Sequence, residues 1–211
     1  MGFALGGSFY AFLFVGTLYM QQVLGFSALE TGMAWLATSL VSVALAGPSQ
    51  LLTTRFGPGP VMVLGMSMIA AGILWATRVP VDGTFWHDLV GPFLVTGAGT
   101  AFGFIPISVA GLTGIAQQHA GVASGLLNTA QQVGGALGVA IASTVATTHT
   151  VTRLAEGAPG PEALTAGFQA AFWACCAIAA LAIPVGLLVA RPRNPQDADR
   201  PLSEQRLGGA S

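Results

Sequence analysis

Charged residues occur only in short intervals of this 211-residue chain, and they separate six long apolar stretches. Asp, Glu, Lys and Arg are absent from 2–29, 31–54, 56–77, 89–118, 120–152 and 163–190. A helix needs roughly 20 mostly apolar residues to cross a bilayer, and each stretch supplies enough. The pattern therefore predicts an all-α membrane protein, a single six-helix bundle (1–190) with helices near 3–24, 31–53, 61–79, 89–115, 121–147 and 167–190.

The composition excludes several classes of protein. Charged residues make up 7% of the chain, against about 25% in soluble domains, so a soluble globular protein is excluded. A net charge of −1 argues against nucleic acid as a partner, since nucleic-acid binding needs a basic surface. The three histidines are far apart, and Cys175 and Cys176 are adjacent. This spacing does not suit a metal site, and we expect neither a metal nor a cofactor.

Arginine is distributed unequally between the two sides that six spans define. An even number of spans places both termini on one side, which carries Arg55 and the four arginines of the tail. The opposite side has only Arg78 and Arg153, among acidic residues. Because cytoplasmic loops are rich in positive charge, both termini are predicted to be cytoplasmic, in a multi-pass protein of the bacterial plasma membrane. The polar segment 191–211 is expected to be a disordered tail.

The first apolar stretch follows Met1 directly, with no positively charged segment before it. A cleavable secretory signal begins with such a segment. We therefore expect a membrane span here rather than a leader, and the abrupt start suggests further chain upstream.

The fifth stretch is the most regularly patterned. Asn128 and Gln132 fall on one helical face with Gly121, Gly125 and Gly135, because these positions are three or four residues apart. Small residues allow helices to approach closely in lipid, and amides are costly there without partners. Two interpretations remain open: a packing seam whose amides bond to neighbouring helices, or a substrate-facing surface.

Two other stretches suggest movement and binding. Gly99 and Gly103 form a GxxxG pair, and Pro106 is expected to bend the same helix. These residues suit either ordinary close packing or helices that rock against each other. The first stretch is aromatic, and Phe12 and Tyr19 are candidates for a pocket that binds planar hydrophobic compounds. Contact with lipid is the alternative role for its aromatic residues.

Acidic residues are absent from the interior of every predicted span. A proton relay at membrane depth needs Asp, Glu or His, so the chain has no evident proton carrier of its own. Intramembrane catalysis would require paired carboxylates, histidine clusters or a nucleophile with its base. The sequence contains no such arrangement, and an enzyme is not expected.

Three segments resemble one transporter family. GVASGLLNTAQQVGGALGVAI at 121–141 is similar to the penultimate span of the fourteen-span drug:proton antiporters of the major facilitator superfamily. YMQQVLGFSALETG at 19–32 resembles the join between the ninth and tenth spans. RFGPGPVMVLG, which contains Arg55 and Gly57, resembles the degenerate second copy of the superfamily's loop motif. Thr54 and Pro58-Gly59 depart from the full motif, which puts a charge-relay latch in doubt.

The resemblance covers about Phe3 to Arg191 and implies the carboxy-terminal six-helix half of a multidrug exporter. It implies that the first, second, fourth and fifth helices face a central cavity for hydrophobic or amphipathic compounds. It also implies a separate amino-terminal half that carries the coupling carboxylates. Two alternatives remain open: a non-transporting truncated membrane remnant, or a half-carrier that forms homodimers.

Overall fold

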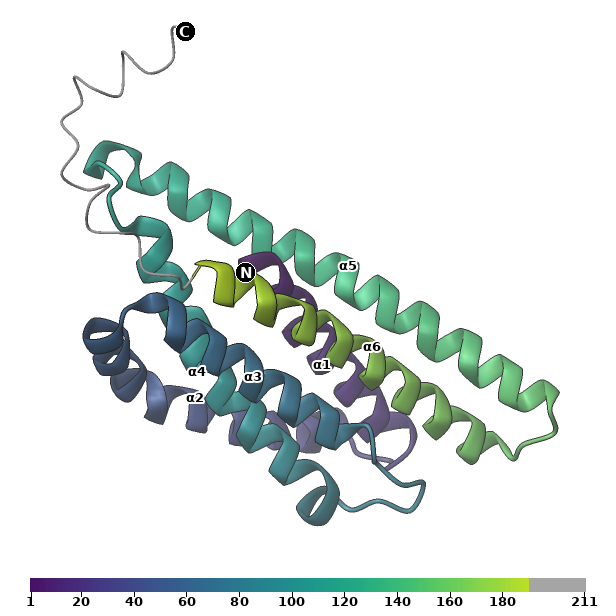
Figure 1. The fold of residues 1–211 in the computed structure, drawn as a ribbon. Helices are drawn as coiled ribbons and strands as arrows, with labels where there is room; N and C mark the ends of the chain where they lie inside the picture. The colour runs from purple at the N-terminus through teal and green to yellow at the C-terminus, as the bar shows by residue number, and fades with distance from the viewer. Residues whose placement is uncertain (190–211) are drawn as a thin grey trace, which may run out of the picture.

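The computed structural model describes residues 1–189, which form six long helices in a single bundle (Figure 1). The segment 191–211, predicted to be a disordered tail, lies outside the described residues. No strand occurs within residues 1–189, which confirms the all-α class. The helices are α1 (Gly2–Gln22), α2 (Ala28–Phe56), α3 (Pro58–Ala76), α4 (Val90–Leu112), α5 (Ala120–Ala155) and α6 (Gly160–Val189).

Within residues 1–189, five helical segments are long and apolar enough to cross a membrane. They are α1, α2, α3, α4 with the short π-helix η1 (Phe85–Leu89) before it, and α6. The described part of α5 does not meet the same criterion, although it is 36 residues long. The amides and hydroxyls of α5 lower its mean hydropathy, and two of these amides, Asn128 and Gln132, belong to the face predicted from the sequence.

The connection between α5 and α6 is shorter than expected. α5 continues to Ala155 rather than ending near residue 147, and α6 begins at Gly160 rather than near 167. Gly157, with φ of 86°, lies in the reversal. The added turns pack on each other, because a Cβ on Gly167 would collide with Thr150 and with the backbone of α5. The connection predicted between residues 147 and 167 was therefore too long.

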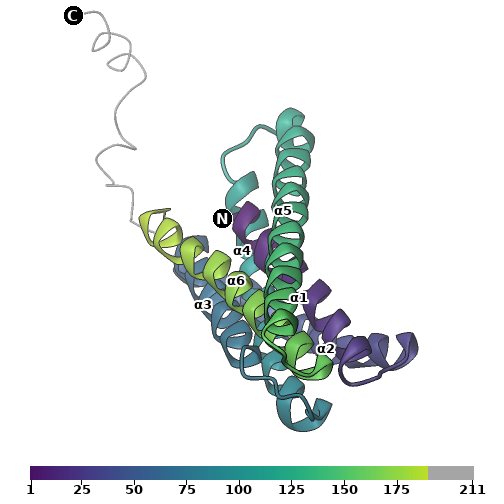
Figure 2. The same cartoon turned by 90° about the vertical axis from the view of Figure 1, so that its right-hand side faces the viewer.

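Figure 1 shows α5 along one edge of the bundle and α2 at the opposite edge. α4 packs against both α3 and α2, and α1 packs against both α5 and α6. In Figure 2, α3 and α6 lie on one side and α2 extends away on the other. The outer faces of α2 carry several exposed apolar side chains, including Leu36, Leu40 and Val43. α2 and α5 are therefore the least enclosed helices of the bundle.

The buried core is centred on α1. Phe12 is fully buried, and its ring centroid lies 5.7–5.8 Å from those of Trp35, Phe93 and Phe172. Trp35 stacks on Phe93 with centroids 4.2 Å apart, and its indole Nε1 donates a hydrogen bond to Thr17. Edge-to-face and offset arrangements are the favoured geometries of aromatic pairs. This cluster joins α1, α2, α4 and α6 into one unit.

Candidate functional site

A cavity of about 420 Å³ lies between α1, α2 and α4. We call it the α1/α2/α4 cavity. Among the described residues 1–189, no charged side chain lines this cavity; its walls combine aromatic and aliphatic groups with four hydroxyls. The lining residues are Phe9, Thr38, Ser39, Ser42, Val43, Ala46, Thr100, Ala101, Phe104 and Ile105.

The hydroxyl groups of this cavity come from facing positions on α2 and α4. Thr100 donates to Ser42 Oγ at 3.1 Å and is also placed to donate to the Gly97 carbonyl at 2.7 Å. The Thr38 hydroxyl is buried and has no hydrogen-bond partner among the described residues. Gly97 allows this approach, because a Cβ there would meet the backbone of Thr38. This oxygen is enclosed by the protein, so Thr38 contributes to the wall of the cavity without offering its hydroxyl to a bound molecule.

A row of aromatic rings leads from this cavity toward α5. Phe104 meets Phe9 edge-to-face with centroids 6.1 Å apart, and Phe9 lies 5.8 Å from Tyr10. The Tyr10 ring in turn lies against Gly135 of α5. The row therefore connects α4, α1 and α5.

Asn128 and Gln132 lie on α5 seven and three residues before Gly135, at the spacing that places side chains on one helix face. Both side chains are exposed. A Cβ at Gly121 or Gly125, further along the same face, would meet nothing within 4 Å among the described residues. The predicted polar face of α5 is thus open. Neither glycine lies in a seam between described helices, so their packing role stays a prediction.

Phe12 and Tyr19 were predicted to bind substrate, but they do not lie at a cavity surface. Both are fully buried, and neither lines the α1/α2/α4 cavity. The Tyr19 hydroxyl donates to the Pro80 carbonyl at 2.6 Å, and Gln169 of α6 donates to the neighbouring carbonyl of Val79 at 2.8 Å. Together they attach the connection after α3 to α1 and α6. In this structure both aromatic residues hold the bundle together, and their role in binding stays a prediction.

Glycines of α4 and α5 form close contacts with neighbouring helices, although Gly121 and Gly125 do not. Cβ atoms on Gly134 and Gly138 would collide with the α1 backbone at Phe3 and Gly7. Gly99 lies against the α3 backbone at Ile69, whereas Gly103 faces the side chain of Leu5 on α1. Pro106, also predicted to be a hinge residue, is buried inside α4, which continues as a helix on both sides of it.

The predicted cytoplasmic loop motif forms the join between α2 and α3. Arg55 lies in the last turn of α2, where a cation complements the helix dipole, and its guanidinium lies 5.4 Å from the Phe56 ring centroid. Gly57 adopts a φ of 83° and separates the two helices. No ion pair with Arg55 occurs among residues 1–189.

Sequence reasoning did not select Ser42, Thr100 and Phe104, although they line the cavity. A signal was present, because Thr38 and Ser42 are four residues apart on α2. Hydroxyls in membrane helices commonly bond to their own backbone, however, so this spacing alone does not identify a cavity.

The site has the chemistry of a binding surface. Within the described part of the chain no three His, Cys, Asp or Glu residues cluster as metal ligands. The cavity offers aromatic contact and hydroxyl groups to a small, largely apolar molecule.

The comparisons with known proteins agree with this picture. The family model described as "Major Facilitator Superfamily" matches residues 1–209. A puromycin resistance protein of Streptomyces alboniger is 32% identical over 186 residues, which cover 87% of this chain and 36% of that protein. A tetracenomycin C resistance and export protein of Streptomyces glaucescens is 33% identical over 64% of this chain and 25% of its own length. A cephamycin export protein of Amycolatopsis lactamdurans is 31% identical over 61% of this chain and 27% of its own length.

These matches define the class of protein: the α-helical membrane proteins of a transporter superfamily. The chain belongs to the major facilitator superfamily. It spans about a third or less of the length of the relatives described above. As expected from its apolar helices, it is a multi-pass membrane protein.

Proposed function

We propose that this chain forms one half of an exporter of hydrophobic or amphipathic small molecules, and that the surface from α2 across α1 and α4 to α5 lines half of the substrate pathway. The observation that carries the proposal is the α1/α2/α4 cavity, with its row of aromatic rings leading to the open polar face of α5. Relatives named for resistance to antibiotics or for their export support this choice of substrate class.

The exposure of α2 and α5 supports the presence of a second six-helix half beside this bundle. Asn128 and Gln132 are exposed on α5, in the first half of a helix that belongs to a membrane bundle. Amide groups facing lipid are costly, so this face requires protein or a water-filled pathway beside it. A second six-helix bundle packed against α2 and α5 supplies both, and rocking of one bundle against the other exposes a midplane site to each side in turn.

The coupling group belongs to that partner in this proposal. Among residues 1–189, no ionisable residue lines the α1/α2/α4 cavity, and Glu30 lies at the start of α2, where its carboxylate accepts hydrogen bonds from Ser27. Proton antiport in the assembled carrier therefore uses a carboxylate outside the described helices. The arginine distribution supports a cytoplasmic location of both termini.

A chimera tests this function. Residues 1–189 replace the segment that they match in the puromycin resistance protein of Streptomyces alboniger, and growth in puromycin and efflux of a fluorescent dye are measured. We expect the chimera to restore both, and efflux to stop when the proton gradient is collapsed. An inserted chimera that moves no dye would contradict the proposal.

Matched variants locate the pathway within the chimera. Asn128→Ala and Gln132→Ala on the open face are expected to change apparent dye affinity by about two- to tenfold, the range of one hydrogen bond. Leu126→Ala, also exposed on α5, serves as the control and should leave affinity unchanged. Equal behaviour of all three variants would remove both amides from the substrate pathway.

A further inference from the structure

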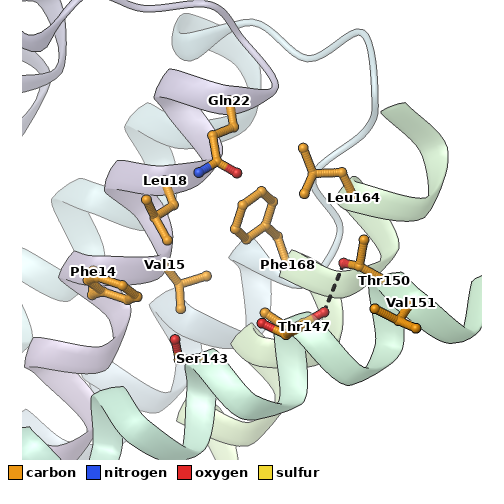
Figure 3. A pocket seen from close by; sticks show the side chains of 11 residues that line it. Phe14, Val15, Leu18, Gln22, Ser143, Thr147, Thr150, Val151, Leu164 and Phe168 are labelled. Atoms are coloured by element: carbon orange, nitrogen blue, oxygen red, sulfur yellow. Dashed lines mark hydrogen bonds between the residues drawn. The ribbon is translucent and has the colours of Figure 1, made fainter. Parts of the chain in front are cut away.

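A second cavity, between α1, α5 and α6, points to a binding site that does not depend on the proposed pathway. We propose that this α1/α5/α6 cavity binds uncharged compounds of one or two fused rings that carry a hydroxyl or carbonyl group. Its volume is about 280 Å³, and it shares no lining residue with the α1/α2/α4 cavity (Figure 3).

The cavity arises where the tight contact between α1 and α5 ends. Gly134 and Gly138 bring α5 against the backbone of α1. Beyond Ala142, further along α5, Ser143 and Thr147 line an open space instead of a close backbone contact. Ala146, which continues the four-residue spacing of Gly134, Gly138 and Ala142, also lines this space.

The cavity has a buried floor and an open rim. Val15 and Phe168 are 1% and 3% exposed and form the apolar base. Gln22, Thr147 and Val151 are exposed and surround the opening. A molecule that enters therefore places its apolar part against aromatic and aliphatic side chains and keeps its polar part near the rim.

Three hydrogen-bonding groups around this cavity are free. Within residues 1–189, the side chains of Gln22, Ser143 and Thr147 form no hydrogen bond, whereas Thr150 donates to the Ala146 carbonyl at 2.8 Å. Most helical threonines of α5 are satisfied in the same way, by the carbonyl four residues earlier. In Figure 3 the ring of Phe168 lies between Gln22 and Thr147. A ring that packs on Phe168 is therefore within reach of polar groups from α1 and α5.

The absence of charge among the lining residues selects the kind of ligand. Among residues 1–189, no ionisable side chain lines the cavity, and Arg153, further along α5, is paired with Glu156 at 3.3 Å. A cationic ligand would find no counter-charge, and a lipid phosphate would find no cation. An acyl chain would form no hydrogen bond with Gln22, Ser143 or Thr147, whereas a ring compound with a hydroxyl or carbonyl group can. A volume near the lower limit for ligand pockets suits a compact ring system.

The test measures binding of prodan, an uncharged naphthalene ketone whose fluorescence reports its surroundings, to the 211-residue chain in lipid nanodiscs. Empty nanodiscs supply the background of lipid partitioning. Thr147→Val keeps the shape of the side chain and removes its hydroxyl; Thr148→Val makes the same change at an exposed neighbour outside this cavity. We expect saturable binding that Thr147→Val weakens about three- to tenfold and Thr148→Val leaves unchanged.

Further variants distinguish binding at the α1/α5/α6 cavity from binding at the α1/α2/α4 cavity. Ser143→Ala should also weaken prodan binding, and Phe104→Ala, in the α1/α2/α4 cavity, should not. Loss of binding in Phe104→Ala with no change in Thr147→Val would overturn the proposal without affecting the proposed pathway. Absence of saturable binding, or a phospholipid found by mass spectrometry to occupy the purified chain and to be lost in Thr147→Val, would also overturn it. Far-UV circular dichroism verifies that each variant is equally helical.

Discussion

The contact between α1 and α5 gives a quantitative prediction, because two glycines of one helix differ in their surroundings. A Cβ added at Gly138 would collide with the backbone carbonyl of Gly7, which cannot rotate away. A Cβ added at Gly125 would meet nothing within 4 Å among the described residues. Both changes to alanine gain helix propensity, by up to about 1 kcal/mol. Only Gly138→Ala must move a helix, which costs about 1–3 kcal/mol.

The difference between the two variants isolates the cost of this close contact. We expect Gly138→Ala to unfold about 1–3 kcal/mol more easily than Gly125→Ala, a difference of roughly five- to 150-fold in the unfolding equilibrium. The assay is unfolding of the purified chain in mixed micelles with increasing sodium dodecyl sulfate, followed by far-UV circular dichroism. Equal stability of the two variants would refute the packing of α1 on α5 described above. Gly134→Ala, which meets the backbone of Phe3, should behave like Gly138→Ala.

Three further predictions concern single side chains. Tyr19→Phe removes the hydrogen bond to Pro80 and should lower stability by about 0.5–1.5 kcal/mol in the same unfolding assay, while chimera efflux persists. Ser27→Ala removes the capping box with Glu30 at the start of α2 and should cost about 1 kcal/mol; full retention of stability would contradict the cap. Phe9→Ala, which breaks the aromatic row, should weaken dye affinity in the chimera more than it alters stability, and the reverse order would assign Phe9 to packing alone.

The six helices could be predicted from the sequence because charge is excluded from them. The C-terminal end of α5 and the N-terminal end of α6 could not. Residues 148–155 carry hydroxyls and a histidine, which suggest a loop. They remain helical because α6 packs beside them, with Gly167 against Thr150. This contact joins residues distant in sequence, so no local pattern indicates it.

The inward face of α1 could not be predicted for a different reason. α1 is apolar on all sides, since lipid and protein core favour the same side chains, and no periodicity marks its buried stripe. Phe12 and Phe9 therefore look alike in the sequence, yet one is in the core and the other lines a cavity. The glycine seam of α5 was easier to recognise, because Gly134 and Gly138 have the four-residue spacing that close packing in lipid requires.

The properties of α5 link the packing of the bundle to its proposed role. One face of the helix carries Gly134 and Gly138 and is committed to α1, whereas Asn128 and Gln132 remain open. The same amides, together with the hydroxyls of the helix, leave α5 outside the group of described helices that are apolar enough to cross a membrane. Its contacts with α1 and α6 stabilise α5 within the bundle, and its polar face needs a neighbour other than lipid. In the two-bundle carrier that we propose, this neighbour is the substrate pathway, so one helix joins the packing of the bundle to its role.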